Sequence, residues 1–257
     1  MAVTTDARTE TPTEHSAVRL RGVWDALRSR EGMLLVFGLF CLTLLWKFGR
    51  THHFRRVFGE SFAGHEFETL LPYLWVSGSS VVTRMLLPLA FIVLVLREKP
   101  RDFGYQLNGT GGLGRIYLVL LAIMVPLLWL AAGTPAFQHK YPFWSEAGAS
   151  WSNLLLWEAR YFFIFLSGES FWRGFLLFGL AKRFGWHALS ISMIPYVMVH
   201  FGKPPIETLG AIVTAYVLGY LALKHRSFWL GVLLHFTIAF LMDVFSLIRQ
   251  GALPTVW

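Results

Sequence analysis

Long apolar segments alternate with short polar breaks along most of this chain. Seven of them follow one another from residue 33 onward, and most approach the ~20 residues that a helix needs to cross a bilayer. They cover residues 33–48, 70–96, 116–132, 154–181, 188–201, 206–223 and 228–248. Because hydrocarbon offers no hydrogen-bonding partner, each segment must satisfy its own backbone groups, which favours α-helices. The pattern therefore predicts an all-α polytopic membrane protein with about seven transmembrane helices.

Two parts of this pattern are less regular. The segment at residues 70–96 exceeds the length of one span, so it forms one long tilted helix or is divided at Gly78-Ser79-Ser80. Residues 1–30 are polar and mixed in charge, which predicts a disordered or amphipathic tail with its amphipathic piece around residues 18–27. The transmembrane domain is then expected to cover residues 31–257.

Basic residues in the connections predict the orientation of the bundle. Cytoplasmic loops of membrane proteins carry an excess of Lys and Arg. Such residues follow the second, fourth and sixth segments, at 97–101, 182–183 and 224–226, and five arginines precede the first segment. We therefore expect these connections and the N-terminus on the cytoplasmic side. The basic loop at residues 47–56 does not fit this scheme.

Composition supports a membrane protein and argues against other classes. Of the 257 residues, 55% are hydrophobic and 15% are charged, whereas about 25% are charged in ordinary soluble proteins. The net charge of +8 comes mainly from the connections between apolar segments, so we expect the lipid bilayer, and no nucleic acid, as a partner. The single cysteine, Cys41, excludes an internal disulfide.

An acid and a base interrupt the fourth apolar segment. Glu169 and Arg173 are four residues apart, so on a helix they lie on one face and can form an ion pair. Ionisable side chains inside a membrane span are costly, and they usually face a protein interior or a wet cavity. This pair is therefore a candidate functional site.

Two histidines are expected at a similar depth in later segments. Glu169, His200 and His235 lie 9 to 13 residues from the basic or histidine residue at the cytoplasmic end of their segments. At a rise of about 1.5 Å per residue this places all three roughly 13–20 Å from the boundary, near the middle of the hydrocarbon layer. A lone buried histidine is most often a satisfied core residue, but three titratable groups at one level predict a shared polar site.

Further polar residues surround these groups. Tyr196 lies one turn before His200 on the same helix face, and Glu207 occupies the first turn of the next helix. An acid there suits the helix dipole, so Glu207 is a supporting site residue or simply stands in a favourable position. Asp243 follows His235 by two turns but lies about 80° around the helix, so it supports the site or faces elsewhere. For Glu158 we favour a charge at the membrane interface.

Together these residues resemble the CPBP (Abi) family of intramembrane proteases. The resemblance rests on Glu169-x-x-x-Arg173-Gly174, then Tyr196-x-x-x-His200, then His235 in a later segment, and it covers about residues 97–243. That family includes the endoprotease that trims prenylated CaaX tails and bacterial members tied to bacteriocin immunity or peptide maturation. The resemblance implies an intramembrane endopeptidase of a membrane-associated peptide or protein, in a bacterial inner membrane.

Three positions depart from the family pattern. The family carries two adjacent glutamates, and here Gly168 stands in place of the first. Tyr196 replaces a phenylalanine, and Ala239 stands four residues after His235, where the family has asparagine or a similar polar residue. The first departure matters most, because the leading glutamate is the family's usual water-activating residue.

The resemblance implies glutamate-dependent hydrolysis with neither metal nor cofactor. In our hypothesis Glu169 and His200 hold and deprotonate a water, His235 stabilises the oxyanion or protonates the leaving amine, and Arg173 orients Glu169. A zinc site built from one Glu and two His ranks lower, because the chain has no H-E-x-x-H spacing. Two other classes stay open: a non-catalytic binding or immunity protein on the same fold, and a transporter or proton relay.

Overall fold

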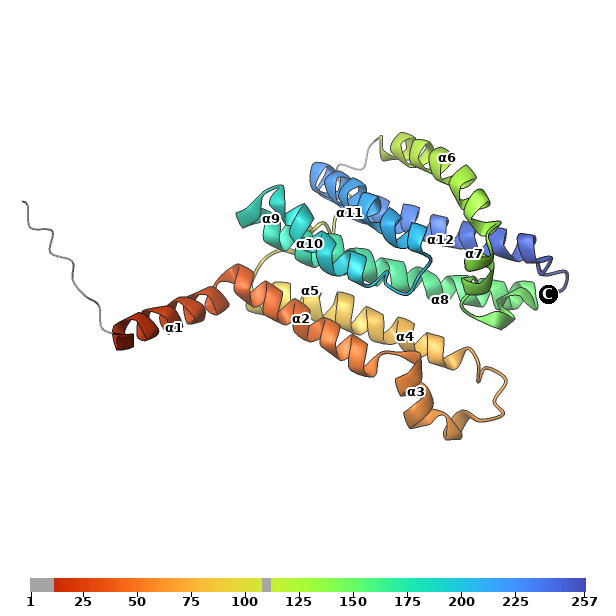
Figure 1. Ribbon diagram of the computed structural model, residues 1–257, viewed down its shortest axis with the longest axis horizontal. Helices are drawn as coiled ribbons and strands as arrows, with labels where there is room; N and C mark the ends of the chain where they lie inside the picture. The colour runs from red at the N-terminus through yellow and green to blue at the C-terminus, as the bar shows by residue number, and fades with distance from the viewer. Residues whose placement is uncertain (1–11, 108–111) are drawn as a thin grey trace, which may run out of the picture.

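The computed structural model describes residues 12–107 and 112–257, with side chains from residue 20 onward. This part of the chain is helical and contains no strand (Figure 1). The all-α class with about seven membrane helices is thus confirmed. Residues 1–11 of the expected tail lie outside the described residues, and a helix occupies the rest of it up to residue 28.

The elements are named here in chain order, with η for 3₁₀ and π segments. The first half comprises α1 (Pro12–Arg28), α2 (Arg30–Phe48), α3 (Thr51–Phe58), η1 (Glu60–Phe62), α4 (Leu71–Val81), η2 (Val82–Leu86), α5 (Leu87–Ala90), η3 (Phe91–Val95) and η4 (Pro100–Phe103). The second half comprises α6 (Leu113–Ala132), α7 (Pro135–Lys140), η5 (Ser145–Gly148), α8 (Trp151–Glu169), η6 (Ser170–Phe178), α9 (Gly179–Phe184), α10 (His187–Met198), α11 (Pro205–His225) and α12 (Trp229–Gln250).

Six helices of the described chain are long and apolar enough to cross a membrane. They are Arg30–Phe48, Leu71–Val95, Leu113–Ala132, Trp151–Phe184, Pro205–His225 and Trp229–Gln250. The remaining predicted segment, residues 188–201, is represented by α10, which has only 12 residues. The protein is therefore an integral membrane protein in which one helix of the bundle is shorter than a full span.

The second apolar segment forms one long helix, which decides between the two alternatives left by its sequence. Leu71–Val95 continues through Gly78 without a break, as α4, η2, α5 and η3 in succession. Two hydroxyls bond back to carbonyls of the preceding turn, Ser77 Oγ to Tyr73 O and Thr83 Oγ1 to Ser79 O. These two hydroxyls are thus satisfied within the helix itself, so a break is not needed to accommodate them.

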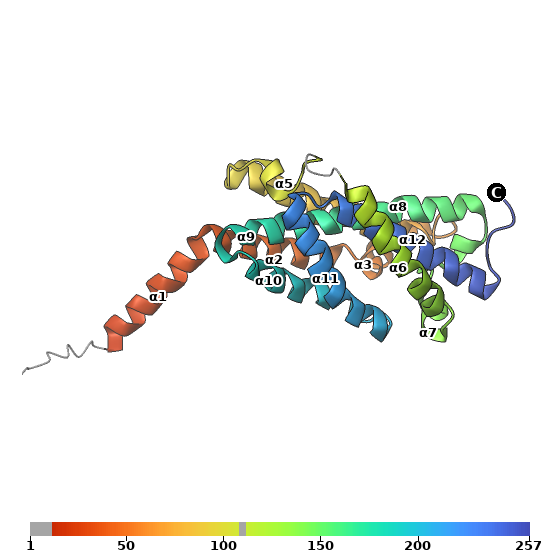
Figure 2. The same cartoon turned by 90° about the horizontal axis from the view of Figure 1, so that it is seen from above.

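The fourth span is the central element of the bundle. In its apolar part 78% of the residues are buried, against 11% to 39% in the other five spans. It comprises α8, η6 and α9, which pack against α4 and η2 on one side and α10, α11 and α12 on the other (Figures 1 and 2). Ser150 caps its N-terminus by accepting the backbone N–H of Asn153. The acid and base picked out in the sequence therefore lie in the most enclosed helix.

The predicted cytoplasmic connections meet at one end of the molecule. Glu98 bonds to Arg30 at the start of α2 and to Lys182 at the end of α9. Gln106 donates to the backbone oxygen of Arg226, the residue that ends α11. The three basic connections and the start of α2 thus share one end, as their charges predicted. That this end faces the cytoplasm stays a prediction.

The connection between η3 and α6 also contacts the motif-bearing helix directly. Tyr105 and Ser170 share a hydroxyl–hydroxyl bond. A side-chain Cβ at Gly174 would lie 3.2 Å from the Phe103 carbonyl oxygen, closer than side chains ordinarily approach. Glycine at this position therefore lets the connection lie against η6.

Candidate active site

Glu169 and Arg173 form an ion pair inside the bundle. Arg173 Nη1 lies 2.8 Å from Glu169 Oε1, and the two side chains are 3% and 1% exposed. Glu169 ends α8, and Arg173 lies in η6, a π segment, whose wider turns are frequent at functional sites. The pairing predicted from the spacing is confirmed.

His235, on α12, is the third member of this group and contacts Glu169. Its Nδ1 lies 2.9 Å from the same oxygen, Glu169 Oε1. An ionised carboxylate only accepts hydrogen bonds, so Nδ1 carries the proton and Nε2 is left for another partner. The His235 side chain is 20% exposed, which leaves this edge of the group open.

The second oxygen of the Glu169 carboxylate has no partner. Oε2 is buried, and no donor in the described chain reaches it within hydrogen-bonding distance. Gly231 of α12 faces it: a Cβ there would stand 2.6 Å from Oε2, closer than any real Cβ contact. The chain therefore holds one oxygen with Arg173 and His235 and leaves the other free to accept.

Tyr196 connects this group to His200. The guanidinium of Arg173 lies 4.1 Å from the centre of the Tyr196 ring. The His200 and His235 rings lie 4.8 Å and 6.4 Å from the same ring. His200 Nδ1 lies 2.9 Å from the Tyr196 carbonyl, which can only accept, so Nδ1 carries the proton and Nε2 is left free.

The structure thus gathers every residue for which we predicted a catalytic role. We call this group the Glu169 cluster: Glu169, Arg173, Tyr196, His200 and His235. Glu169 contacts Arg173 and His235 directly, whereas His200 reaches them through Tyr196. The expectation that three titratable groups share one level agrees with this arrangement.

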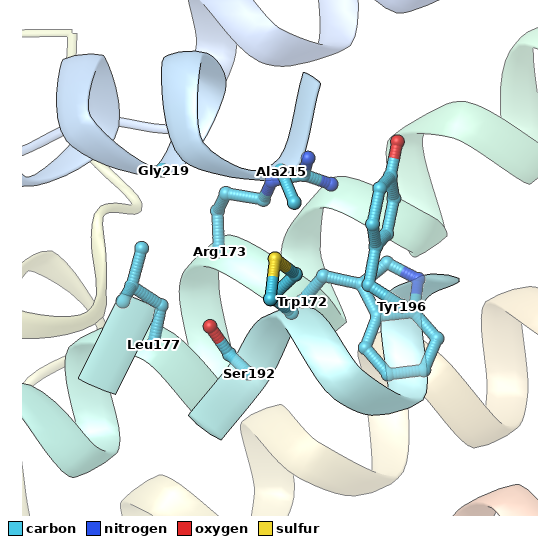
Figure 3. A pocket seen from close by; sticks show the side chains of 8 residues that line it. Trp172, Arg173, Leu177, Ser192, Tyr196, Ala215 and Gly219 are labelled. Atoms are coloured by element: carbon cyan, nitrogen blue, oxygen red, sulfur yellow. The ribbon is translucent and has the colours of Figure 1, made fainter. Parts of the chain in front are cut away.

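A small hollow borders the cluster (Figure 3). Arg173 and Tyr196 lie on its wall, with the guanidinium beside the tyrosine ring (Figure 3). The other lining residues are Trp172, Leu177, Ser192, Met193, Ala215 and Gly219. The hollow therefore reaches the cluster from the side of α10 and α11, away from Glu169.

Glu207 lies beside the cluster with partners of its own. It accepts from the Tyr141 hydroxyl and from Lys203 Nζ, each at 2.6 Å. Burial raises the pKa of the Tyr141 phenol, so this group stays a donor. The next residue, Thr208, donates to the His200 carbonyl at 2.9 Å. Glu207 is thus part of the packing that holds the turn at His200.

Asp243 faces away from His235 into a second polar group. Its Oδ2 accepts from Trp157 Nε1 at 2.6 Å, and the side chain is fully buried. Glu158 lies near Asp243 and is 4% exposed, so it is enclosed by the bundle and our expectation of an interfacial charge was wrong. Helices α4 and α12 pack against this face of α8 and cover the carboxyl group. We call Trp157, Glu158, Arg160 and Asp243 the Asp243 cluster.

One residue near the site was not recognised from the sequence. Arg84, in η2, donates from Nη2 to the Ile164 carbonyl and to Ser167 Oγ, both at 3.1 Å. Its charge acts on Glu169, and its Nη1 lies 3.5 Å from where a Cβ of Gly168 would stand. A lone arginine in an apolar segment was the available signal, because such residues usually mark functional positions.

Other chemistry in the described residues was considered. They contain no group of three or more His, Cys, Asp or Glu side chains placed to hold a metal ion. Ala239, the third departure from the family pattern, packs with other hydrophobic side chains beside Trp157 and Tyr161. It therefore contacts the Asp243 side of the bundle.

Comparison with known proteins identifies the central part of the chain. Residues 150–241 match the family model described as type II CAAX prenyl endopeptidase Rce1-like. This segment is CAAX-protease-like. The match confirms the resemblance, includes the whole Glu169 cluster and indicates a membrane-embedded protease. No curated protein and no solved structure gives a significant match to the chain.

Proposed function

We propose that this protein is an intramembrane endopeptidase of the CPBP type, which hydrolyses a peptide bond of a membrane-associated peptide or protein. The family match supports the reaction class, and the spans support the location. One observation carries the assignment to this site. Glu169 has one oxygen held by Arg173 and His235 and a buried second oxygen with no partner, as a positioned general base needs.

The geometry supports a division of labour for activating the water. Glu169 Oε2 accepts a proton from the water. His200, which packs against Tyr196, accepts a second hydrogen bond from the same water through its free Nε2 and so holds it in place. Arg173 balances the charge of the carboxylate and fixes its orientation, because it binds the oxygen that does not react. The water oxygen then attacks the carbonyl carbon of the scissile bond.

In this proposal His235 stabilises the negative charge of the oxyanion and protonates the leaving amine. Its Nδ1–H stays bonded to Glu169, so its Nε2 faces the open edge of the cluster. Protonated there, it donates to the oxyanion of the tetrahedral intermediate and then to the leaving amine. The amine gains the Nε2 proton of His235, and the proton that Glu169 took from water then passes to His235, which restores both groups without an outside acid.

The domain and orientation assignments belong to the same proposal. Residues 31–257 form the membrane domain, and residues 97–243 contain the family core. The end that carries Arg30, Lys182 and Arg226 faces the cytoplasm of a bacterial inner membrane, which places the N-terminus inside.

A cleavage assay tests this proposal. The purified protein is reconstituted with a library of membrane-anchored peptides, and products are identified by mass spectrometry. Glu169→Gln keeps the volume and hydrogen-bonding shape but removes the base, so we expect cleavage to fall by about 10²–10⁴-fold. Equal cleavage by both proteins would remove Glu169 from the mechanism. Peptide binding without cleavage by the wild type would support a non-catalytic binding protein, which the departures at Gly168 and Ala239 favour.

A further inference from the structure

Arg84 carries a charge that the described chain does not neutralise. Its hydrogen bonds go to a neutral carbonyl and a neutral hydroxyl, on Ile164 and Ser167. Nε is buried without a partner, and no carboxylate of the described chain lies within ion-pair distance of this guanidinium. The nearby acid, Glu169, is already bound to Arg173 and His235. An unpaired guanidinium in a span is costly, which favours binding of an anion there.

Gly168 leaves room for that anion. A Cβ at this position would meet Arg84 Nη1 first, at 3.5 Å, and Trp172 Cδ1 at 4.0 Å, which are ordinary contact distances. A Cβ-sized atom is therefore accommodated beside the guanidinium, on the turn that carries Glu169. Because residue 168 has no side chain, nothing from α8 itself occupies that place.

The position of Arg84 along its helix limits what can reach it. The span runs from Leu71 to Val95, so Arg84 lies 13 residues from one end and 11 from the other. At about 1.5 Å per residue it is roughly 16–20 Å from either end, far from the level of lipid phosphates. A peptide whose scissile bond lies at Glu169 does reach this level.

We propose that Arg84 is a substrate-binding residue that receives a carboxylate of the peptide substrate, close to the bond that Glu169 cleaves. A guanidinium binds a carboxylate through charge-assisted N–H···O bonds, and Nη1, the Arg84 nitrogen nearest to Gly168, is a donor that the bonds to Ile164 and Ser167 leave available. The carboxylate is supplied by the C-terminus of the peptide or by an acidic side chain. This inference rests on the proposed function.

Binding and cleavage are measured separately, so that the two proposals can fail independently. A fluorescent, lipid-anchored degenerate peptide library is made with a free C-terminal acid, with a C-terminal amide, and as an amide that carries an internal aspartate. Each is tested for binding to Glu169→Gln protein in nanodiscs and for cleavage by the wild type. We expect the free acid to bind about 10- to 100-fold more tightly than the amide, the range for hydrogen bonds to charged groups.

Variants assign the preference to Arg84. Arg84→Gln is expected to reduce the acid-to-amide ratio to about 1, and Arg84→Lys to keep part of it, because lysine keeps the charge but loses the planar set of donors that holds Ile164 and Ser167 as well. Gly168→Glu supplies a carboxylate from the chain itself, so we expect it to bring the acid-to-amide ratio to about 1 as well. Arg160→Gln, at the buried arginine of the Asp243 cluster, is the control and should leave the ratio unchanged.

Each outcome has one meaning. Preference for the aspartate-bearing amide over the plain amide, lost in Arg84→Gln, identifies a side chain as the source of the carboxylate. Cleavage that depends on Glu169 but treats acid and amides equally overturns the Arg84 inference and leaves the proposed function standing. An Arg84-dependent preference without cleavage supports the inference and refutes the protease. Affinity that follows the content of anionic lipid instead of the peptide overturns it in favour of lipid phosphate.

Discussion

The molecule contains two buried polar clusters, and the proposed function assigns chemistry to only one of them. In the Glu169 cluster the guanidinium binds the carboxylate at 2.8 Å, and His235 is 20% exposed. In the Asp243 cluster Arg160 stacks 3.5 Å from the Trp157 ring, and all four side chains are at most 6% exposed. The first cluster has an open edge, and the second is sealed by aromatic rings.

The difference shows that burial of titratable groups does not by itself mark a catalytic site. Glu158 and Asp243 lie together, and two carboxyl groups form a hydrogen bond only if one of them holds a proton. Glu169 instead contacts two positive or proton-donating partners, Arg173 and His235, through one oxygen. The ion pair of the carboxylate and the exposed edge at His235 distinguish the two clusters better than burial or charge does.

Removing one carboxylate from each cluster should give the largest contrast. Glu169→Gln is expected to reduce the initial rate of cleavage by about 10²–10⁴-fold, because it removes the general base. Glu158→Gln is expected to keep the rate within a factor of about two, because Glu158 contacts no residue of the Glu169 cluster. Rates are compared per folded protein. A loss of equal size in Glu158→Gln, at unchanged thermal stability, would show that the Asp243 cluster takes part in the reaction.

A change next to Glu169 should give the second largest effect. Gly231→Ala places a Cβ 2.6 Å from Oε2, so the carboxylate must move away from its present position. We expect kcat to fall by about 10-fold or more, since small displacements of reacting groups are costly. Gly210→Ala is the matched control, because a Cβ there meets nothing within 4 Å. An unaffected kcat in Gly231→Ala would show that the position of Oε2 is not critical.

Disruption of the Asp243 cluster should change stability and leave catalysis intact. Trp157→Phe keeps the ring but removes the N–H that Asp243 Oδ2 accepts at 2.6 Å. We expect a loss of about 1–3 kcal/mol in the free energy of unfolding, measured by denaturant titration in detergent, with kcat unchanged. Trp186→Phe, at an exposed position, serves as the control. A reduced kcat in Trp157→Phe would place this cluster in the catalytic machinery.

The ion pairs at the predicted cytoplasmic end should give the smallest effect, and it depends on pH. The bond to Arg30, with that to Lys182, lowers the pKa of Glu98 below its ordinary value of 4.5. A group with a lowered pKa adds stability above the ordinary value and loses it as pH falls through the folded value. We expect Glu98→Gln to lower the unfolding temperature at pH 7 and to have a smaller effect at pH 3. An equal effect at both pH values would contradict this origin.

The sequence predicted the spans and the Glu169–Arg173 pair, because both depend on local spacing. It predicted that His235 lies at the level of Glu169, but the bond between them depends on how α12 is rotated and on the close approach at Gly231. The same rotation turns Asp243 away from His235 and toward Trp157. The spacing in the sequence did not decide between these two directions.

Two features needed the tertiary structure. Glu158 is buried because α4 and α12 cover its face of α8, and nothing in the residues around it indicates this cover. Arg84 is more than 80 residues away from the site in sequence, so its contact with Ser167 follows only from the packing of η2 against α8. Isolated charges in apolar segments show that partners exist but do not identify them.

The short helix α10 has a consequence for how water enters. Its 12 residues rise about 18 Å, well short of a hydrocarbon layer about 30 Å thick. The turn that carries His200 then ends inside this layer, or the bilayer thins to meet it. In the first case the polar backbone of this turn needs water or protein partners at that depth. Under the proposed function, water that reaches this turn serves the reaction at the Glu169 cluster in an otherwise dry layer.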